Sequence, residues 1–179
     1  IPTGLTLIVI ISIFGPISGA HFNPIVSLVF WLKRIMSFKD FIAYVVMQIS
    51  GAIFGCVVAN IIFKLPPVTI STLVRHDFSQ FLSEILATFG LILVIFIGSE
   101  VSKQNIPVLV GSYITSAYWF TSSTSFANPA VTVARQFSDT FTGISPSGVP
   151  TFIIAQIFGA ILGFIVIQFL TNTVIESDY

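Results

Sequence analysis

Two Asn-Pro dipeptides, Asn23-Pro24 and Asn128-Pro129, each lie within an apolar stretch of the chain. An Asn side chain can cap the first turn of a helix, and Pro suits the first helical position because no N–H is needed there. Each dipeptide therefore predicts a helix that begins inside an apolar region. A bilayer tolerates such a break only where the backbone is buried in protein or lines a water-filled cavity. Two broken segments in corresponding halves of a hydrophobic chain indicate a central permeation or binding site.

The composition places these breaks in a membrane. Charged residues make up 8% of the chain and hydrophobic residues 55%, whereas a soluble domain carries roughly 25% charged residues. The net charge of zero provides no basic surface for nucleic acid, so we expect no nucleic-acid partner. The single cysteine, Cys56, cannot form an internal disulfide, and no metal-ligand cluster surrounds it. We therefore expect an integral membrane protein without a metal or other cofactor.

Hydropathy predicts five full membrane spans and two half-length helices. A spanning helix needs roughly 20 mostly apolar residues, and a helix of about 9 residues covers near half of the hydrocarbon thickness. We expect the half-length helices over 24–32 and 129–137. The full spans are expected over about 3–16, 41–63, 78–99, 108–120 and 151–173.

The two halves of the chain repeat each other. The stretch from Asn23 to Ser27 matches that from Asn128 to Thr132, and Gln48-Ile49-Ser50-Gly51-Ala52 matches Gln156-Ile157-Phe158-Gly159-Ala160. A unit with an odd number of full spans must face the opposite way when it is repeated in series, which predicts an inverted repeat. We expect one transmembrane domain over 1–179, with repeat 1 over about 1–63 and repeat 2 over about 78–173. Repeat 1 shows one span fewer, so we expect a further span before Ile1.

The two Asn-Pro-Ala-like boxes, the Ser-Gly-Ala-His stretch before the first box and the Gln-x-x-Gly-Ala pattern after each box resemble the aquaporin family of major intrinsic proteins. The resemblance covers essentially the whole chain. It implies an all-α membrane protein, a right-handed helical bundle of six tilted helices plus two half-helices that meet head to head at the bilayer centre. It also implies a homotetramer with one pore per subunit, located in the cell membrane, and a channel rather than an enzyme.

In this resemblance the two boxes form the midpoint of the pore. The Asn side chains would present amide donors to passing molecules, and the positive half-helix ends would repel cations and protons. One box residue departs from the family: the first box ends in Ile25, where Ala is usual. Ile is bulkier than Ala, either in the pore wall or in packing. The midpoint residues are Asn23, Pro24, Ile25, Asn128, Pro129 and Ala130.

The selectivity filter is where the chain departs most from the family. Most members have an Arg directly after the second box, and this chain has Val131. The resemblance places the other filter positions near Thr3, Ser116 and Ser125, so we expect a filter that is wider than a strict water filter. Arg135 lies one helical turn after Val131 and could reach back toward the pore mouth. Its alternatives are contact with lipid headgroups or a pair with Asp139.

Other polar residues inside the predicted spans are interpreted as structural. The resemblance implies that Glu84 accepts hydrogen bonds from a pore loop rather than relaying protons. His21 is expected to anchor the first loop rather than to sense pH. Gln48 and Gln156 are expected to be structural polar residues of the following helices. Glycines that recur every four residues indicate close helix packing, and these are Gly51, Gly55, Gly159 and Gly163.

These patterns favour a passive channel for small uncharged solutes, such as glycerol-like polyols, urea or metalloid hydroxides, and for water. A bacterial branch of the family with Val after the second box is similar to this chain, which predicts the bacterial inner membrane as its location. An orthodox water-selective channel stays open as an alternative. An ion-coupled transporter is a more distant one, since it needs charged groups beside the breaks. An intramembrane hydrolase is disfavoured because no Gly-x-Ser-x-Gly elbow is present.

Overall fold

The structure of the protein, a computed structural model, describes residues 1–177, with side chains as far as Leu170. Every regular element in this range is helical, which confirms the predicted all-α architecture. The side chains of 171–173, at the end of the predicted last span, lie outside the described ones. The elements are α1 (Pro2–Ser18), α2 (Pro24–Leu32), α3 (Phe38–Ile62), α4 (Phe78–Ser102), the 3₁₀ turn η1 (Lys103–Asn105), α5 (Ile106–Phe120), α6 (Pro129–Arg135) and α7 (Val149–Ser177).

The two short helices begin at the Asn-Pro dipeptides because each Asn caps its own helix. The Asn23 side chain accepts a hydrogen bond from the Ile25 N–H, and the Asn128 side chain accepts from the N–H groups of Ala130 and Val131. Both Asn residues have extended backbone, with φ of −154° and −159°. The caps thus satisfy first-turn donors that have no partner within the helix.

Helix α2 has the predicted bounds, whereas α6 ends at Arg135 and not at the predicted residue 137. The reason is a change of hydrogen-bond partner after Arg135. The Phe137 N–H turns back to the Ala134 carbonyl, and the Phe137 carbonyl accepts from the Thr69 N–H at 3.1 Å. The chain therefore leaves the helix to pair with the segment between α3 and α4.

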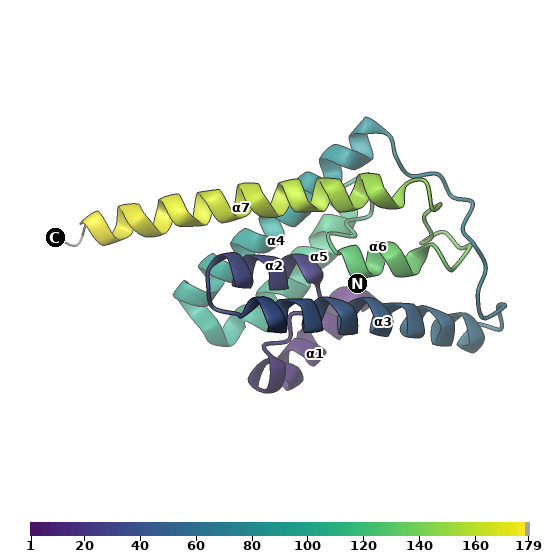
Figure 1. Ribbon diagram of the computed structural model, residues 1–179, viewed down its shortest axis with the longest axis horizontal. Helices are drawn as coiled ribbons and strands as arrows, with labels where there is room; N and C mark the ends of the chain where they lie inside the picture. The colour runs from purple at the N-terminus through teal and green to yellow at the C-terminus, as the bar shows by residue number, and fades with distance from the viewer. Residues whose placement is uncertain (178–179) are drawn as a thin grey trace.

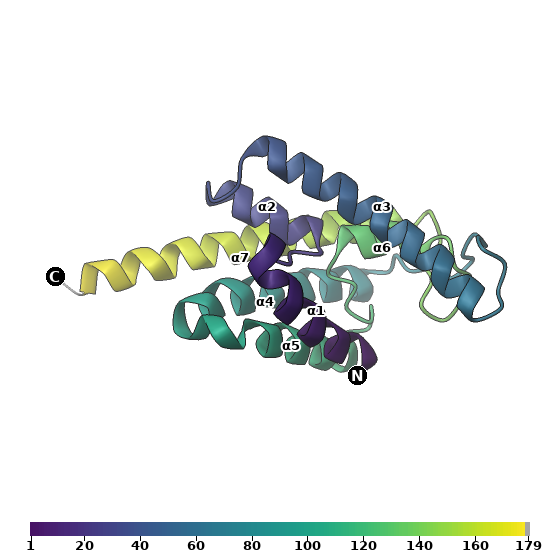
Figure 2. The same ribbon diagram turned by 90° about the horizontal axis from the view of Figure 1, so that it is seen from below.

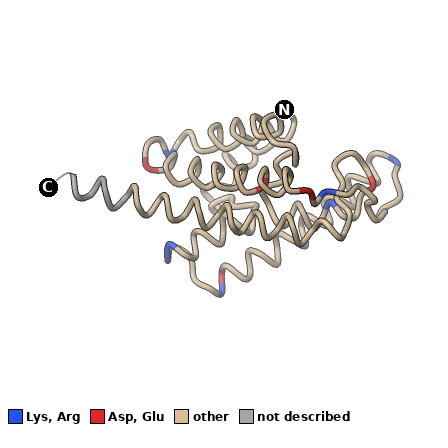
Figure 3. Tube along the Cα trace, turned by 90° about the horizontal axis from the view of Figure 1, so that it is seen from above, with Lys and Arg blue, Asp and Glu red and all other residues tan. Residues whose placement is uncertain are grey.

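Three apolar helical stretches are long enough to cross a membrane: Phe38–Ile62, Phe78–Phe120 and Val149–Leu170. The second stretch contains α4 and α5, which are separated by η1 and pack against each other. Helix α1, Pro2–Ser18, is a shorter apolar helix. Figure 3 shows the charged residues mainly at turns and helix ends, with the long helices largely free of them. This distribution suits helices that lie in lipid.

The longer helices surround the two short ones. Helix α4 packs along α7, α1 packs along α5, and α3 contacts both α2 and α6 (Figure 1). The view in Figure 2 shows α1 beside α5, with α2 and α6 beside α3. Helices α2 and α6 also contact each other and α7. This arrangement holds the two Asn-Pro starts at the centre of the molecule.

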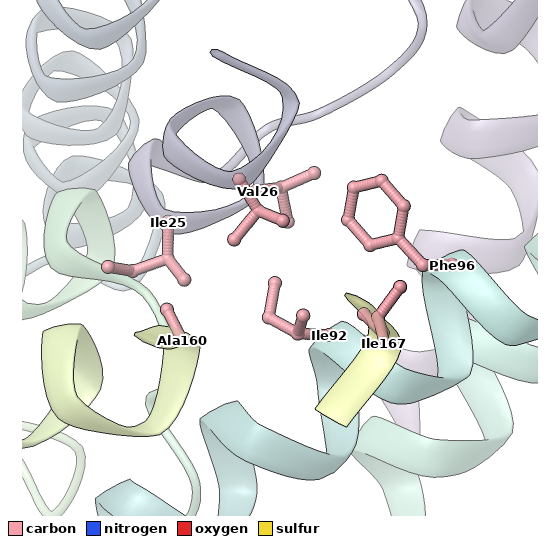
Figure 4. Close-up of a cluster of buried hydrophobic side chains, with 7 residues drawn as sticks. Ile25, Val26, Ile92, Phe96, Ala160 and Ile167 are labelled. Carbon is pink, nitrogen blue, oxygen red and sulfur yellow. The ribbon is translucent and has the colours of Figure 1, made fainter. Parts of the chain in front are cut away.

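A buried apolar cluster fixes the first short helix against two long ones. Its side chains come from α2, α4 and α7 and turn toward one another (Figure 4). Ile25, the departure from the usual Ala, is 2% exposed and belongs to this cluster. Because lipid tails are as apolar as these side chains, the cluster stabilises the fold through close packing rather than through transfer from water. The cluster consists of Ile25, Val26, Val29, Ile92, Phe96, Ala160 and Ile167.

The predicted glycine packing occurs in only one of the two repeats. A Cβ atom at Gly159 would meet the Ile85 carbonyl oxygen at 2.4 Å, and one at Gly163 would meet Ile92 at 2.9 Å. Helix α7 can therefore approach α4 closely only because these positions lack a side chain. A Cβ atom at Gly51 or Gly55 on α3 would meet nothing within 4 Å. The corresponding face of α3 is open in the described structure.

Candidate functional site

The two loops that precede the short helices hold each other through their Asn side chains. Asn23 Nδ2 donates to the Ala127 carbonyl at 2.7 Å, and Asn128 Nδ2 donates to the Phe22 carbonyl at 2.9 Å. Each bond joins an Asn to the residue just before the other Asn. An amide group carries two N–H donors, so each Asn keeps a second N–H beyond this loop contact.

Both loops contain backbone conformations that residues other than glycine rarely adopt. Ala20 and Phe22 have φ of 48° and 47°, and Ser125 and Ala127 have φ of 48° and 45°. These left-handed values stand at matching positions before the two Asn residues. Such conformations persist only when the surroundings hold them in place, and they concentrate at functional sites. These conformations directly precede the two Asn residues whose side chains join the loops.

Glu84 on α4 holds the second loop. Its carboxylate accepts hydrogen bonds from the N–H groups of Phe126 and Ala127, each at 2.8 Å. It also accepts from Ser123 Oγ at 2.6 Å and from Gln156 Nε2 at 2.7 Å. The carboxylate is completely buried, so these four donors compensate for the water it has lost. This geometry agrees with the loop-anchoring role expected for Glu84 and leaves it no free oxygen for a proton relay.

Gln48 and Gln156 make the same contact in the two halves. Gln48 Nε2 donates to Ser27 Oγ at 3.0 Å in α2, and Gln156 Nε2 donates to Thr132 Oγ1 at 2.9 Å in α6. The repeated pair ties each short helix to the long helix that follows it. His21 Nδ1 lies 3.0 Å from the same Ser27 hydroxyl, so His21 anchors the first loop to its own helix.

A cavity of about 820 Å³ runs past both loops. Asn23 and Asn128 line it, while the other box residues, Pro24, Ile25, Pro129 and Ala130, are buried behind them. Part of the cavity wall carries the side chains that the filter prediction concerns, together with the residues in contact with Arg135. We call this region the neck, and it is lined by Thr3, Tyr118, Ser125, Phe126, Val131 and Arg135.

The structure brings three of the four predicted filter residues to the neck, and Ser116 is the exception. Ser116 is exposed, donates to the Ser112 carbonyl at 3.0 Å and does not line the cavity. The reason is the phase of α5. Its cavity-lining residues include Ile106, Val110, Ile114 and Tyr118, spaced by four, whereas Ser116 points about 200° away from Ile114. Tyr118 therefore occupies the place in the neck that was expected for Ser116.

Arg135 follows neither of its two alternatives. Its Nη2 donates to the Tyr118 hydroxyl at 2.9 Å, and its guanidinium carbon lies 4.2 Å from the centre of the Phe126 ring. Asp139, the predicted pairing partner, instead accepts from the Thr72 N–H at 2.9 Å. Arg135 thus turns back to the neck, as in the first of the directions considered from the sequence, toward the pore mouth.

A second arginine, which sequence reasoning did not single out, fastens the segments around the neck. Arg75 precedes α4, and its guanidinium donates to the carbonyls of Gly143, Ser123 and Phe141. Burial, with the nearby Arg135 charge, lowers the pKa of Arg75 below its ordinary value. No local motif marks this residue, because its partners lie far along the chain. Among the described residues, no His, Cys, Asp or Glu cluster could hold a metal ion.

Comparison with known proteins identifies one family. The sequence model described as Major intrinsic protein matches residues 1–124. The chain is 49% identical over 170 residues to Aquaglyceroporin AqpS of Rhizobium meliloti (strain 1021), which covers 95% of this chain and 73% of that protein.

More distant relatives include channels with other names. The chain is 27% identical over 150 residues to the Glycerol uptake facilitator protein of Bacillus subtilis (strain 168), a match that covers 75% of this chain and 55% of that protein. It is also 27% identical over 146 residues to human Aquaporin-4, covering 75% of this chain and 44% of that protein. The chain thus spans about half the length of these two relatives.

Proposed function

Because the chain belongs to the major intrinsic protein family, whose members are membrane channels and not enzymes, we propose that it conducts small uncharged solutes larger than water. The solutes are glycerol-like polyols, urea and metalloid hydroxides, and water is a further permeant. The protein lies in the cell membrane. We extend the proposal to a homotetramer in a bacterial inner membrane, with one pore in each subunit.

Val131 is the observation that carries the proposal. It lines the same cavity as Asn23 and Asn128, and its side chain has neither a charge nor a hydrogen-bond donor. An Arg at this place would fill part of the lumen. With Val there, the lumen beside residue 131 is wider than an Arg side chain would leave it. The names of two relatives, an aquaglyceroporin and a glycerol uptake facilitator, support this size class.

The two Asn side chains supply the polar contacts at the midpoint. Each side-chain oxygen caps its own helix, and each amide retains one N–H after the contact between the loops. A passing molecule must offer an oxygen atom to both donors, which interrupts a chain of waters that protons could follow. The positive ends of α2 and α6 act in the same sense and disfavour cations.

The proposal includes one channel domain built from two inverted repeats, about 1–63 and 78–173. The paired contacts Gln48 to Ser27 and Gln156 to Thr132 support it, as do the reciprocal Asn contacts. An ion-coupled transporter would need a free charged group beside the breaks. Glu84 is the acid closest to that role, and its oxygens are occupied by four donors.

Stopped-flow light scattering on proteoliposomes tests the function. We expect the purified protein to raise the permeability to water and to at least one of glycerol, urea and arsenous acid above that of empty liposomes. Potassium efflux from the same vesicles should stay at the empty-liposome level. Transport of water with none of the three solutes would favour the water-selective alternative and refute the proposal.

A further inference from the structure

The neck has a charged donor although position 131 lacks one. Arg135 lies in the last turn of α6, four residues after Val131, so both side chains lie on one face of the helix. Both line the cavity. The short Val131 side chain leaves part of the cavity open, and the longer Arg135 side chain lines it from one helical turn further along.

The Arg135 guanidinium is held from two sides. Nη2 donates to the Tyr118 hydroxyl, and the guanidinium carbon lies over the Phe126 ring in a cation–π contact. Thr3, from the start of α1, interacts with the same Tyr118 hydroxyl. A planar, delocalised cation fixed by an aromatic ring and a hydroxyl group loses little further freedom when it binds a solute.

Two polar atoms of the neck lack a protein partner. Arg135 Nη1 is buried and makes no hydrogen bond, and the same is true of Ser125 Oγ. Ser125 is 3% exposed, so its hydroxyl is almost completely withdrawn from bulk solvent. Buried polar groups are normally hydrogen-bonded, and an exception beside a cavity indicates a partner from outside the protein, such as a solute or a water molecule. A charged donor and a hydroxyl that both donates and accepts would suit a solute hydroxyl group.

Arg75 and Arg135 differ in how many of their guanidinium donors have protein acceptors. Arg75 lies near the same Phe126 ring, with its guanidinium carbon 5.5 Å from the ring centre. Its Nε, Nη1 and Nη2 each donate to a backbone carbonyl. This is the pattern of an arginine that fastens loops. Arg135 makes one side-chain hydrogen bond and keeps Nη1 free of protein acceptors.

We infer that Arg135, held by Tyr118, is the specificity-determining residue of the neck and that it selects small neutral solutes with hydroxyl oxygens. The inference rests on the proposed channel function. Arg135 donates to a solute oxygen, and Ser125 exchanges a hydrogen bond with the same or a neighbouring hydroxyl. The fixed positive charge also keeps cations out of the neck. The position of the donor, one turn beyond residue 131, keeps the lumen wide enough for a polyol.

The test compares variants in proteoliposomes made from the full chain. Arg135→Gln removes the charge and the fork of donors, and Tyr118→Phe removes only the hydroxyl that holds Arg135. The matched control is Tyr113→Phe on the same helix. The Tyr113 hydroxyl donates to the Ala87 carbonyl at 3.0 Å, and Tyr113 does not line the cavity. Glycerol permeability, water permeability and potassium efflux are measured for each protein.

We expect Arg135→Gln to lower the ratio of glycerol to water permeability about tenfold, since a charged donor forms a stronger hydrogen bond than a neutral one. It should also raise potassium efflux. Tyr118→Phe should lower the glycerol-to-water ratio about threefold, because Arg135 loses the hydroxyl that holds its guanidinium in place. Potassium efflux should not rise, because the Arg135 charge remains. Tyr113→Phe should leave the ratio at the wild-type value.

The inference is overturned if Arg135→Gln conducts water and its glycerol-to-water ratio is unchanged or higher. A higher ratio would show that Arg135 only narrows the neck. Should Arg135→Gln fail to fold, Tyr118→Phe decides, and a ratio equal to that of Tyr113→Phe overturns the inference. These results differ from a failure of the proposed function, in which the wild-type protein itself conducts no solute.

Discussion

Asn23 and Asn128 each donate a side-chain hydrogen bond to the backbone carbonyl of the residue that precedes the other. The two bonds, at 2.7 and 2.9 Å, join loops that lie more than half the chain apart in sequence. Each Asn oxygen is meanwhile used as the cap of its own helix. One residue type thus caps a helix, joins two loops and keeps a donor for the cavity, which no other side chain of this size can do.

Replacement of Asn128 by Asp tests the midpoint donors. A carboxylate accepts but does not donate, so Asn128→Asp retains the cap of α6 and loses the contact with Phe22. It also places a negative charge beside the two helix N-termini. We expect water and solute permeability to fall and potassium efflux to rise.

Asn105→Asp is the matched control, because Asn105 is exposed and bonds only to Ser102. Potassium efflux that is equal in the two variants would contradict a role for Asn128 in cation exclusion.

Replacement of Glu84 by Gln tests the anchor of the second loop. In Glu84→Gln an NH₂ group replaces one carboxylate oxygen, and an NH₂ group cannot accept a hydrogen bond. A buried donor that now bonds to Glu84, such as the Ala127 N–H, is then left without an acceptor. Each such group costs about 1–3 kcal/mol. We expect the thermal unfolding midpoint in detergent to fall well below that of the control Glu100→Gln, whose site is exposed. Equal midpoints would show that the carboxylate is not needed to hold the loop.

A pair of glycine substitutions tests how the helices pack. Gly159→Ala places a methyl group 2.4 Å from the Ile85 carbonyl oxygen, so α7 must move away from α4. Overpacking of this kind costs about 1–3 kcal/mol. Gly51→Ala on α3 meets nothing within 4 Å, and Ala is favoured over Gly inside a helix, so the unfolding midpoint of this chain should not fall. A midpoint that falls equally in both variants would contradict the observed asymmetry.

The sequence predicted the features that depend on local chemistry. The start of each short helix follows from Asn as a cap and Pro at the first position, and the structure places both starts there. The end of α6 was predicted too late. It depends on pairing of Phe137 with Thr69, a contact between segments that no local pattern announces.

The neck shows where sequence reasoning fails. The family resemblance, carried over by spacing, placed Ser116 in the filter, but the phase of α5 turns Tyr118 to the cavity. A check of the four-residue spacing from Val110 to Tyr118 would have indicated this. The direction of Arg135 could not be predicted, since it depends on the Phe126 ring and the Tyr118 hydroxyl from other elements.

The repeat predicted close packing at Gly51 as well as at Gly159. The structure shows it only at Gly159, where α4 is the partner.

The permeability of Val131→Arg tests the central claim, that residue 131 lines a neck wide enough for solutes. The substitution adds bulk and charge beside Arg135 without touching the midpoint. We expect glycerol permeability to fall about tenfold, equivalent to ~1.4 kcal/mol of added barrier, and water permeability to fall less. Val131→Leu, which adds bulk alone, should lie between this variant and the wild type. Glycerol and water permeabilities equal to the wild-type values in Val131→Arg would contradict the claim, because residue 131 would then lie outside the conducting path.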